Sequence, residues 1–276
     1  MRDERLVPEI LEEKCADEDN KQIGGHKLHA VLWVYDVLDH FIISVDNKMK
    51  EKRLPLSGSE VTYTPLKWNS KKAKWSNNCY AYAVDDLRQY RIHKAQPGDV
   101  SGMSNNHHDY TTCKGLSKRV VSDNPGKIYV CPDYKKPCPR GYFKVMLFVS
   151  PVKGHADFHW YKQHGAITYK AKVGDTVTSV AAYFKVPMSR IKQATGAKGV
   201  VPGRNIRFKA NVWSHKRGWG GGPLLTDAAG KAILNPRTAN RKYGELNYKK
   251  FCHAFCVKRG GVKVGKSSPQ IGKKLF

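Results

Sequence analysis

Acidic side chains are scarce in this chain of 276 residues. It carries 23 aspartates and glutamates against 49 lysines and arginines, which gives a formal net charge of +26 at pH 7. An excess of this size goes beyond what solubility requires, so we expect an anionic partner. The acids gather at the start, where residues 1–20 hold eight acidic and three basic side chains. We predict that this segment is a separate acidic arm.

Long apolar runs are also missing. The most apolar stretch, residues 30–45, is interrupted by Asp36, Asp39 and His40, which argues against a membrane-spanning helix. The first residues are acidic and lack the basic and apolar regions of a secretory signal peptide. We therefore expect no membrane span and no export through the general secretion pathway.

Cysteine is too sparse for a disulfide scaffold. The seven cysteines are an odd number, so at least one lies outside any intramolecular pair. Two uses are open to Cys131 and Cys138: they bridge each other as a loop staple, or they bind zinc with Cys113 and His107 or His108. The second spacing fits no common zinc module, so we predict no metal site and no cofactor.

A second cysteine pair, Cys252 and Cys256, is four residues apart. That spacing places both on one face of either a strand or a helix, and we assign them no chemistry. Residues 258–276 contain six basic residues and no acid. We predict either a solvated, extended tail or a segment that docks on nucleic acid, an anionic surface or a neighbouring subunit.

Apolar and aromatic residues are plentiful enough for a folded core, at 40% of the chain with six tryptophans and fourteen tyrosines. The β-branched and aromatic runs at 30–38 and 41–45 favour strands. Further strands are expected at 143–149 and 156–162. Low periodicity predicts a long irregular stretch over 98–141.

Residues 76–92 have a helical pattern, with Asn77 or Asn78 suited to the N-cap. The apolar stripe of this helix consists of Tyr80, Ala83, Val84 and Leu87. Cys79 then lies in the first turn. Unpaired amides and the positive end of the helix dipole lower the pKa of a thiol there and favour the nucleophilic thiolate.

Two histidines are candidates for the base that such a cysteine needs. His159 lies in the strand candidate FHWYK, and His215 in WSHK either orients it or replaces it if the two strands pair. A cysteine on a helix followed by a histidine on a strand resembles the order in the papain-like NlpC/P60 and CHAP families. CYAYA at 79–83 is similar to the start of the CHAP helix. The alternative is a buried structural cysteine with core or surface histidines.

A compact pattern runs from residue 167 to residue 208. An alternating strand at 167–173 leads through a turn into a helix at 176–184. Pro187 suits the entry of a second short helix, and Gly196 suits its C-cap. A Pro-Gly turn then precedes the alternating strand NIRF. The predicted order is βααβ.

This pattern resembles a LysM domain over Tyr169 to Phe208, a small module that binds polymers containing N-acetylglucosamine, such as peptidoglycan and chitin. The resemblance implies a groove in which backbone amides and carbonyls recognise acetamido groups. The groove residues that it implies are Gly174, Asp175, Thr176, Val200, Val201 and Pro202. The sequence departs from the family at Ala194, Thr195 and Gly196, so the alternative is a retained fold without glycan affinity.

The aromatic flanks of this module, FHWYKQ and VWSHK, read as two strands of one hairpin. Because the ends of a LysM module lie side by side, we predict that it is inserted into a hairpin of a host domain. The expected fold class is α+β, with a mixed or antiparallel β-rich host that carries a helix at Cys79. The predicted parts are the arm at 1–20, the host at 21–165 and 211–257, the module at 166–210 and the tail at 258–276.

Two functions fit these features. The first hypothesis is a virion-associated structural or attachment protein of the minor capsid type, located in the virion or in the host cytoplasm during assembly. Its partners are neighbouring virion proteins and an N-acetylglucosamine-containing wall polymer. The second is a cysteine-dependent cell-wall amidase or endopeptidase that the LysM-like module targets. Nucleic acid is expected to bind only through non-specific, salt-sensitive charge.

Overall fold

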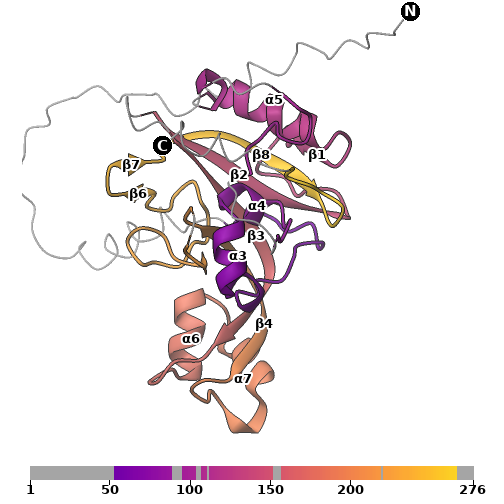
Figure 1. Cartoon of the computed structure of the whole chain (residues 1–276). Coiled ribbons are helices and arrows are strands. Elements are labelled where there is room, and N and C mark those ends of the chain that lie inside the picture. Colours follow the sequence, from indigo (N-terminus) through magenta and orange to yellow (C-terminus); the bar gives the residue numbers. More distant parts are fainter. Residues whose placement is uncertain are drawn as a thin grey trace, which may run out of the picture. The chain divides into compact units, whose positions relative to one another are not determined.

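The computed structural model describes residues 53–88, 95–103, 107–110, 112–151, 157–218 and 220–265. They belong to one unit of the chain, which begins at Arg53. The predicted arm at 1–20 and the strands expected at 30–38 and 41–45 lie outside the described residues. The described part combines helices with an antiparallel sheet, as expected for a mixed α and β fold (Figure 1).

The strands of the described part are β1 (Ile128–Val130), β2 (Tyr142–Ser150), β3 (Asp157–Lys170), β4 (Asn205–Lys216), β5 (Pro223–Leu224), β6 (Lys242–Tyr243), β7 (Leu246–Asn247) and β8 (Lys250–Lys258). Six of them form one antiparallel sheet in the order β1-β8-β2-β3-β4-β5, and β6 pairs with β7. The strand predicted at 143–149 is β2. Those predicted at 156–162 and 167–173 join into the single strand β3.

The helices are α2 (Leu66–Asn69), α3 (Lys71–Ser76), α4 (Cys79–Ala83), α5 (Cys113–Asp123), α6 (Val177–Phe184) and α7 (Met188–Thr195), with 3-10 turns η1 (His107–Tyr110) and η2 (Gly196–Lys198). The helix predicted over 76–92 is therefore much shorter. It ends at Ala83, and Asp85 follows with a positive φ of 61°, which a helix does not accommodate.

Helix α5 corrects the expectation of an irregular stretch over 98–141. Thr112 caps it by accepting a hydrogen bond from the Gly115 amide at 3.1 Å. A Cβ at Gly115 would lie 2.5 Å from the backbone of Asp109, so the glycine that weakens the helical pattern is required by close packing. Leu116 and Val120 are buried on the face of the helix that packs against the core.

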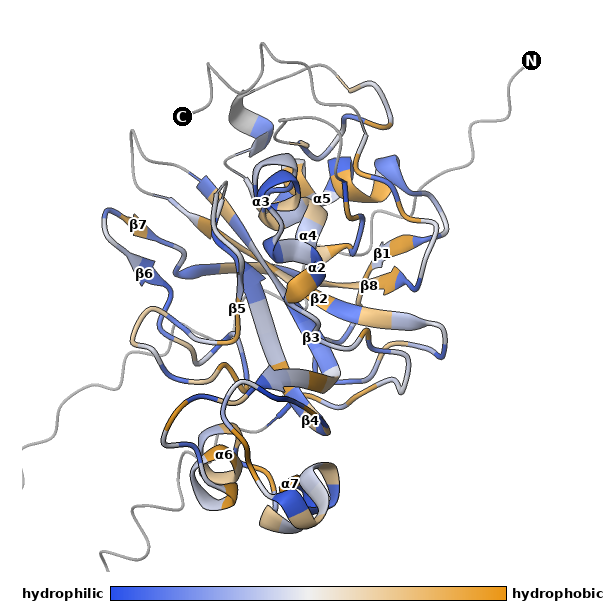
Figure 2. Cartoon of the chain, turned by 60° about the horizontal axis from the view of Figure 1, so that its bottom comes forward, coloured by the Kyte–Doolittle hydropathy of each residue, from blue (hydrophilic) through white to orange (hydrophobic). Residues whose placement is uncertain are grey.

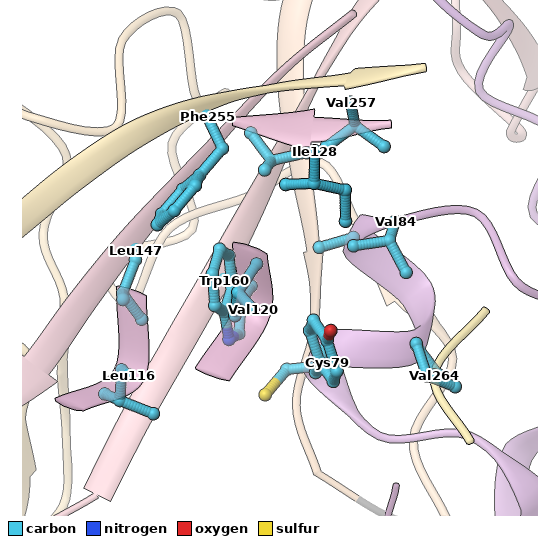
Figure 3. Packing of buried hydrophobic residues seen from close by; sticks show 14 of the residues in the cluster. Cys79, Val84, Leu116, Val120, Ile128, Leu147, Trp160, Phe255, Val257 and Val264 are labelled. Carbon is cyan, nitrogen blue, oxygen red and sulfur yellow. The ribbon is translucent and has the colours of Figure 1, made fainter. Parts of the chain in front are cut away.

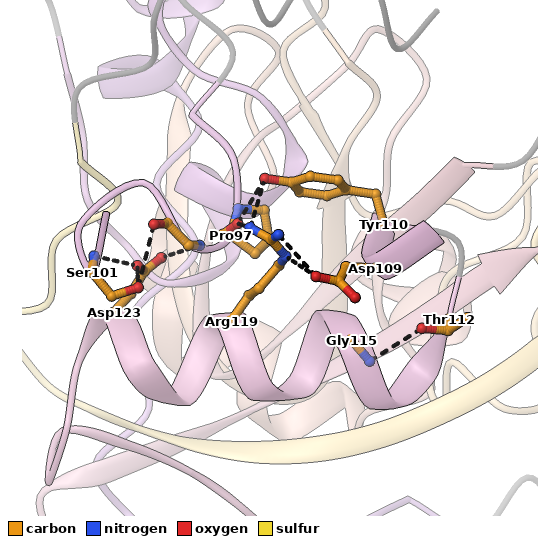
Figure 4. Close-up of polar contacts among 9 residues, drawn as sticks. Pro97, Ser101, Asp109, Tyr110, Thr112, Gly115, Arg119 and Asp123 are labelled. Atoms are coloured by element: carbon orange, nitrogen blue, oxygen red, sulfur yellow. Dashed lines mark hydrogen bonds and ion pairs between the residues drawn. The ribbon is translucent and has the colours of Figure 1, made fainter. Parts of the chain in front are cut away.

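Polar contacts tie the 95–103 segment to α5 (Figure 4). The Asp123 carboxylate accepts hydrogen bonds from the amides of Gly98 at 2.8 Å and Ser101 at 2.9 Å. Arg119 pairs with Asp109 at 2.9 Å. These charge-assisted bonds order a segment that has little apolar sequence of its own.

Side chains alternate between the two faces of the sheet, and each face has its own core. Helices α4 and α5 cover one face, where Cys79 packs with Phe158 and Trp160 of β3. Figure 3 shows Cys79 and Trp160 in this core. Tyr161 of β3 and Trp213 of β4 belong to the core of the opposite face.

Two disulfides attach further segments to β8. Cys252 bonds Cys113 at the start of α5, and Cys256 bonds Cys138 in the loop before β2. The predicted Cys131–Cys138 staple is therefore wrong. The prediction that Cys252 and Cys256 share a face is also wrong. Cys252 is the extra residue of a bulge in β8, and the two cysteines lie in the cores of opposite faces.

The chain continues to pack beyond residue 257, where the host was expected to end. Val262 and Val264 are buried in the core that contains Cys79. The Val264 amide donates to Asp86 at 3.1 Å, and the Lys263 amide donates to Asn124 at 2.9 Å. The basic tail is thus docked on the fold at least to Gly265.

The segment predicted as βααβ has that order. Strands β3 and β4 pair from Tyr161–His215 to Lys170–Asn205, and α6 and α7 lie between them in the sequence. Figures 1 and 2 show both helices at the far end of this long hairpin. Pro187 precedes α7 and Gly196 follows it with a positive φ of 61°, at the predicted positions. We refer to residues 167–208 as the βααβ lobe.

The βααβ lobe is held to the rest of the sheet by side chains from outside it. Tyr63 and Leu234 contribute to its core, which also contains Ile167 and Phe208. The Arg53 guanidinium donates to the carbonyls of Phe184 and Lys185 at 2.7 and 2.6 Å, at the end of α6. Strands β3 and β4 run through both the lobe and the rest of the sheet. Together with these strands, the side-chain contacts hold the lobe in place.

Candidate active site

Cys79 is placed by local capping. Asn78 accepts a hydrogen bond from the Ala81 amide at 3.0 Å, while its own side-chain amide donates to the Ala95 carbonyl at 2.6 Å. Asn78 is therefore the N-cap of α4, one of the two candidates in the sequence, and Cys79 is the first helical residue. The backbone amides of Cys79 and Tyr80 face the sulfur and favour its charged form.

Burial affects the pKa of Cys79 more strongly than its favourable position at the start of the helix. Cys79 is only 7% exposed, and its sulfur reaches the Phe158 carbonyl at 3.9 Å. Loss of solvation raises the pKa of the thiol to about 12, and the nearby Asp157 carboxylate acts in the same direction. The expected lowering of the pKa is therefore wrong for this conformation, in which Cys79 is a protonated thiol. Figure 3 shows the sulfur directed away from Val84 and Val264.

The structure brings the two predicted histidines together. His159 lies on β3, His215 lies on the paired strand β4, and Nε2 of His159 is 2.8 Å from Nδ1 of His215. Both side chains are buried. The paired strands on which the prediction depended are thus present.

One backbone carbonyl sets the protonation of both rings. Nε2 of His215 lies 2.9 Å from the Thr226 carbonyl, which can only accept, so that nitrogen carries the proton. Nδ1 of His215 is then the acceptor for the Nε2–H of His159. Consequently, the lone pair of His159 is on Nδ1, the nitrogen that a general base needs.

Both imidazoles are neutral. Burial lowers the pKa of His159 well below its usual range, with a smaller contribution from His215 and Arg217. Burial also lowers the pKa of His215 to about 4. Aromatic rings surround the pair: Tyr248 lies 5.0 Å from the His159 ring, and Tyr161 lies 5.2 Å from the His215 ring.

Cys79 and the two histidines lie on opposite faces of the sheet. Cys79 packs with Phe158 and Trp160, whereas His159 pairs with Phe148 and its ring lies against Tyr161 in the other core. The sulfur contacts the backbone carbonyl of Phe158 and neither imidazole. The structure therefore does not bring Cys79 together with either predicted base.

Two groups that contact the residues described above could not be recognised in the sequence: the Thr226 carbonyl and the Lys216 side chain. The Thr226 carbonyl is a backbone group, and nothing in the residue type marks it. Lys216 follows His215 at the end of β4 and is fully buried beside α3 and α4. The alternation of side chains along β4 places Lys216 opposite His215, but the pattern alone does not show that a lysine is buried there.

The two loops of the predicted glycan groove are adjacent. Ala171 exchanges backbone hydrogen bonds with Gly203 and Arg204 at 2.8 and 2.9 Å, where the strands of the lobe end. The groove residues next to this junction are Gly174, Asp175, Thr176, Val200, Val201 and Pro202, all of which are at least partly exposed. Asp175 is already occupied within its loop, since it accepts from the Tyr169 hydroxyl at 2.6 Å.

Within the described residues, no group of three or more histidine, cysteine or carboxylate side chains is arranged to hold a metal ion. The proposed zinc set also loses Cys113 and Cys138, which are in disulfides. Among the helices that the structure describes, none is long and apolar enough to span a membrane. No family model, curated protein or solved structure matches this chain.

Proposed function

We propose that the protein is a virion-associated attachment protein in which the βααβ lobe binds a wall polymer that contains N-acetylglucosamine. The observation that carries this proposal is the junction at the exposed end of the lobe, where Ala171 exchanges backbone hydrogen bonds with Gly203 and Arg204 beside the two predicted groove loops.

The βααβ lobe supports a wall polymer as the target. Its order and capping follow the pattern that resembles LysM, and its two loops adjoin at an exposed end. We propose that this end binds a polymer containing N-acetylglucosamine and holds the chain on the wall.

The cysteine-hydrolase hypothesis needs Cys79 and a histidine on the same side of the sheet. Cys79 packs on one face, whereas His159 and His215 lie on the other. Of the two hypotheses, the geometry therefore favours the attachment protein. The two disulfides also favour action outside a reducing cytoplasm.

The test is retention of the full chain on purified peptidoglycan and on chitin in high salt, which weakens attachment that depends only on net charge. Val201→Glu places a charge in the predicted groove and is expected to abolish retention. Leu224→Glu is the matched control, because Leu224 is similarly exposed but lies on β5, outside the lobe. Equal retention of Val201→Glu, or no retention of the parent protein, contradicts the proposal.

A further inference from the structure

One face of the β3–β4 hairpin is basic where it passes through the βααβ lobe. Ile167 of β3 pairs with Phe208 of β4, and both lie in the core of the lobe. Successive side chains of a strand point to opposite faces, so the neighbours of this pair face away from α6 and α7. On that outer face lie the pairs Ala166 and Lys209, Thr168 and Arg207, and Lys170 and Asn205. Three of these six residues are cations and none is an acid.

These cations form a continuous line. Arg207 and Lys209 are two residues apart on β4, which separates them by about 7 Å along the strand. Lys170 on β3 is the diagonal neighbour of Arg207, because it pairs with Asn205, and diagonal neighbours in an antiparallel pair lie about 7–8 Å apart. All three side chains are exposed. We call Lys170, Arg207 and Lys209 the basic stripe.

The basic stripe carries no ion pair among the residues that the structure describes. Neither Lys170 nor Lys209 has a side-chain partner there, and Arg207 donates a hydrogen bond to the Thr62 hydroxyl at 3.4 Å. Like charges side by side on a sheet destabilise it. A sequence that keeps three of them together therefore points to an anion that binds from outside.

The acids close to this surface are engaged elsewhere. Asp175, the one acid in residues 167–208, accepts a hydrogen bond from the Tyr169 hydroxyl at 2.6 Å. The Glu60 carboxylate, beside the bulge in β3, accepts hydrogen bonds from the amide and the hydroxyl of Ser57 at 2.6 and 2.8 Å. Neither carboxylate is in an ion pair with the basic stripe.

The basic stripe ends at the proposed polymer-binding end of the lobe. Ala171 follows Lys170 and exchanges backbone hydrogen bonds with Gly203 and Arg204. Lys172 and Arg204 are exposed at this junction and add two further cations. A polyanion that lies along the stripe therefore reaches the loops at which the wall glycan is proposed to bind.

We propose that the basic stripe binds the phosphodiester backbone of an anionic wall polymer, a chain of polyol phosphates attached to the wall glycan. This inference rests on the proposed function, because the glycan held at the end of the lobe places that polymer beside the stripe. The phosphates recur along a linear backbone, as the cations recur along the stripe. Single-stranded nucleic acid suits the stripe less well, because its bases stack on aromatic side chains and the six paired residues of the outer face include none.

The test is binding of the full chain to purified peptidoglycan that carries poly(glycerol phosphate), compared with the same material after hydrofluoric acid has cleaved the phosphodiesters. Affinity is measured from about 50 mM to about 200 mM salt, and chitin serves as the uncharged polymer. The stripe variant combines Lys170→Gln, Arg207→Gln and Lys209→Gln. The control variant loses the same charge at exposed lysines outside the lobe, Lys118→Gln, Lys231→Gln and Lys249→Gln.

The stripe variant is expected to bind the phosphate-bearing material about tenfold more weakly at low salt, since each of three exposed ion pairs contributes about twofold or more. The dependence of log affinity on log salt is expected to lose about one unit of slope for each lost contact. A purely structural effect does not change this slope. Retention on chitin and on the acid-treated material is expected to equal that of the parent, and the control variant is expected to stay within about twofold of the parent throughout.

The inference is overturned if the folded stripe variant keeps the parent affinity and slope, or if the control variant loses as much. Tighter binding to a DNA duplex than to poly(glycerol phosphate) at equal phosphate concentration, lost in the stripe variant, assigns the stripe to nucleic acid and also overturns it. Circular dichroism identifies variants that have not folded, and Lys170→Gln alone then carries the comparison.

Chitin separates this inference from the proposed function. A parent protein that fails to bind chitin and acid-treated peptidoglycan, but binds the phosphate-bearing material through the stripe, contradicts the proposed glycan binding alone. Retention on chitin without any effect of the stripe variant on the phosphate-bearing material contradicts the role of the basic stripe alone.

Discussion

His159 and His215 face each other across β3 and β4, with Nε2 of the first 2.8 Å from Nδ1 of the second. The strands are antiparallel neighbours, and Tyr161 pairs directly with His215. The contact therefore depends on the register of the hairpin as well as on the two residue types. A slip of one residue would move one ring to the other face of the sheet.

The first prediction concerns this contact. His215→Ala leaves the Nε2–H of His159 and the Thr226 carbonyl without their partner. We expect unfolding free energy to fall by about 1–3 kcal/mol for each buried group left unpaired. His215→Asn offers a side-chain acceptor and is expected to regain part of the loss. Urea unfolding measures both.

Tyr243→Phe is a suitable control, because Tyr243 contacts the same Nε2 of His215 at the longer distance of 3.3 Å. Its removal leaves the Thr226 contact intact and is expected to change stability only slightly. Parent stability in His215→Ala would show that the contact contributes nothing to the fold.

The second prediction is a pH dependence of stability. Burial lowers the pKa of His164 to about 3, against 6.5 in an exposed histidine. The unfolded chain therefore binds more protons than the folded chain between pH 6.5 and about 3, and the folded state loses stability as pH falls through this range. One proton contributes a slope of at most about 1.4 kcal/mol per pH unit.

His164→Gln removes this titration, although it also changes the contacts with Val61 and Ser214. We expect a lower stability at pH 7 and a shallower decline between pH 6 and pH 4. Urea unfolding at a series of pH values measures both. A variant whose decline is as steep as that of the parent shows that other groups cause the acid sensitivity.

The third prediction concerns the disulfides. Cys113–Cys252 and Cys138–Cys256 close loops with sequence separations of 139 and 118 residues. Replacing Cys138 and Cys256 together by serine is expected to cost about 2–5 kcal/mol of unfolding free energy. Reductant should destabilise the parent protein at least as much. Equal stability of the parent with and without reductant would show that the bonds are absent from the purified protein.

Local signals in the sequence predicted the parts of this fold that depend on neighbouring residues. Asn78 as an N-cap, Pro187 before α7 and Gly196 after it act within one helical turn, so their effects are visible in the pattern. The strand alternation of β2 and β3 is equally local. The placement of His159 beside His215 could also be predicted from the sequence, because the flanks of the lobe were expected to form one hairpin.

Long-range features escaped prediction. The partners of Cys252 and Cys256 lie more than a hundred residues away, and the bulge in β8 that separates their faces has no signature residue. The burial of Cys79, which reverses the expected direction of its pKa shift, arises from packing against β3. Glycine at position 115 weakened the helical pattern of α5 for a reason that lies in another segment, Asp109.

The last prediction separates the βααβ lobe from the rest of the fold. His164 pairs with Val212, so replacing residues 166–210 by Asn-Gly joins Gly165 to Asn211 through a two-residue turn suited to a hairpin. The histidine contact and Cys79 lie outside the replaced segment, and we expect the shortened chain to fold. Tyr63 and Leu234 lose their apolar neighbours, so a moderate loss of stability is expected.

Retention on insoluble peptidoglycan or chitin distinguishes the role of the lobe. Binding is measured by pull-down in high salt, which weakens attachment that depends only on the net charge of the chain. We expect the full chain to remain bound and the shortened chain to be released. If both remain bound equally well, the wall contact lies outside the βααβ lobe.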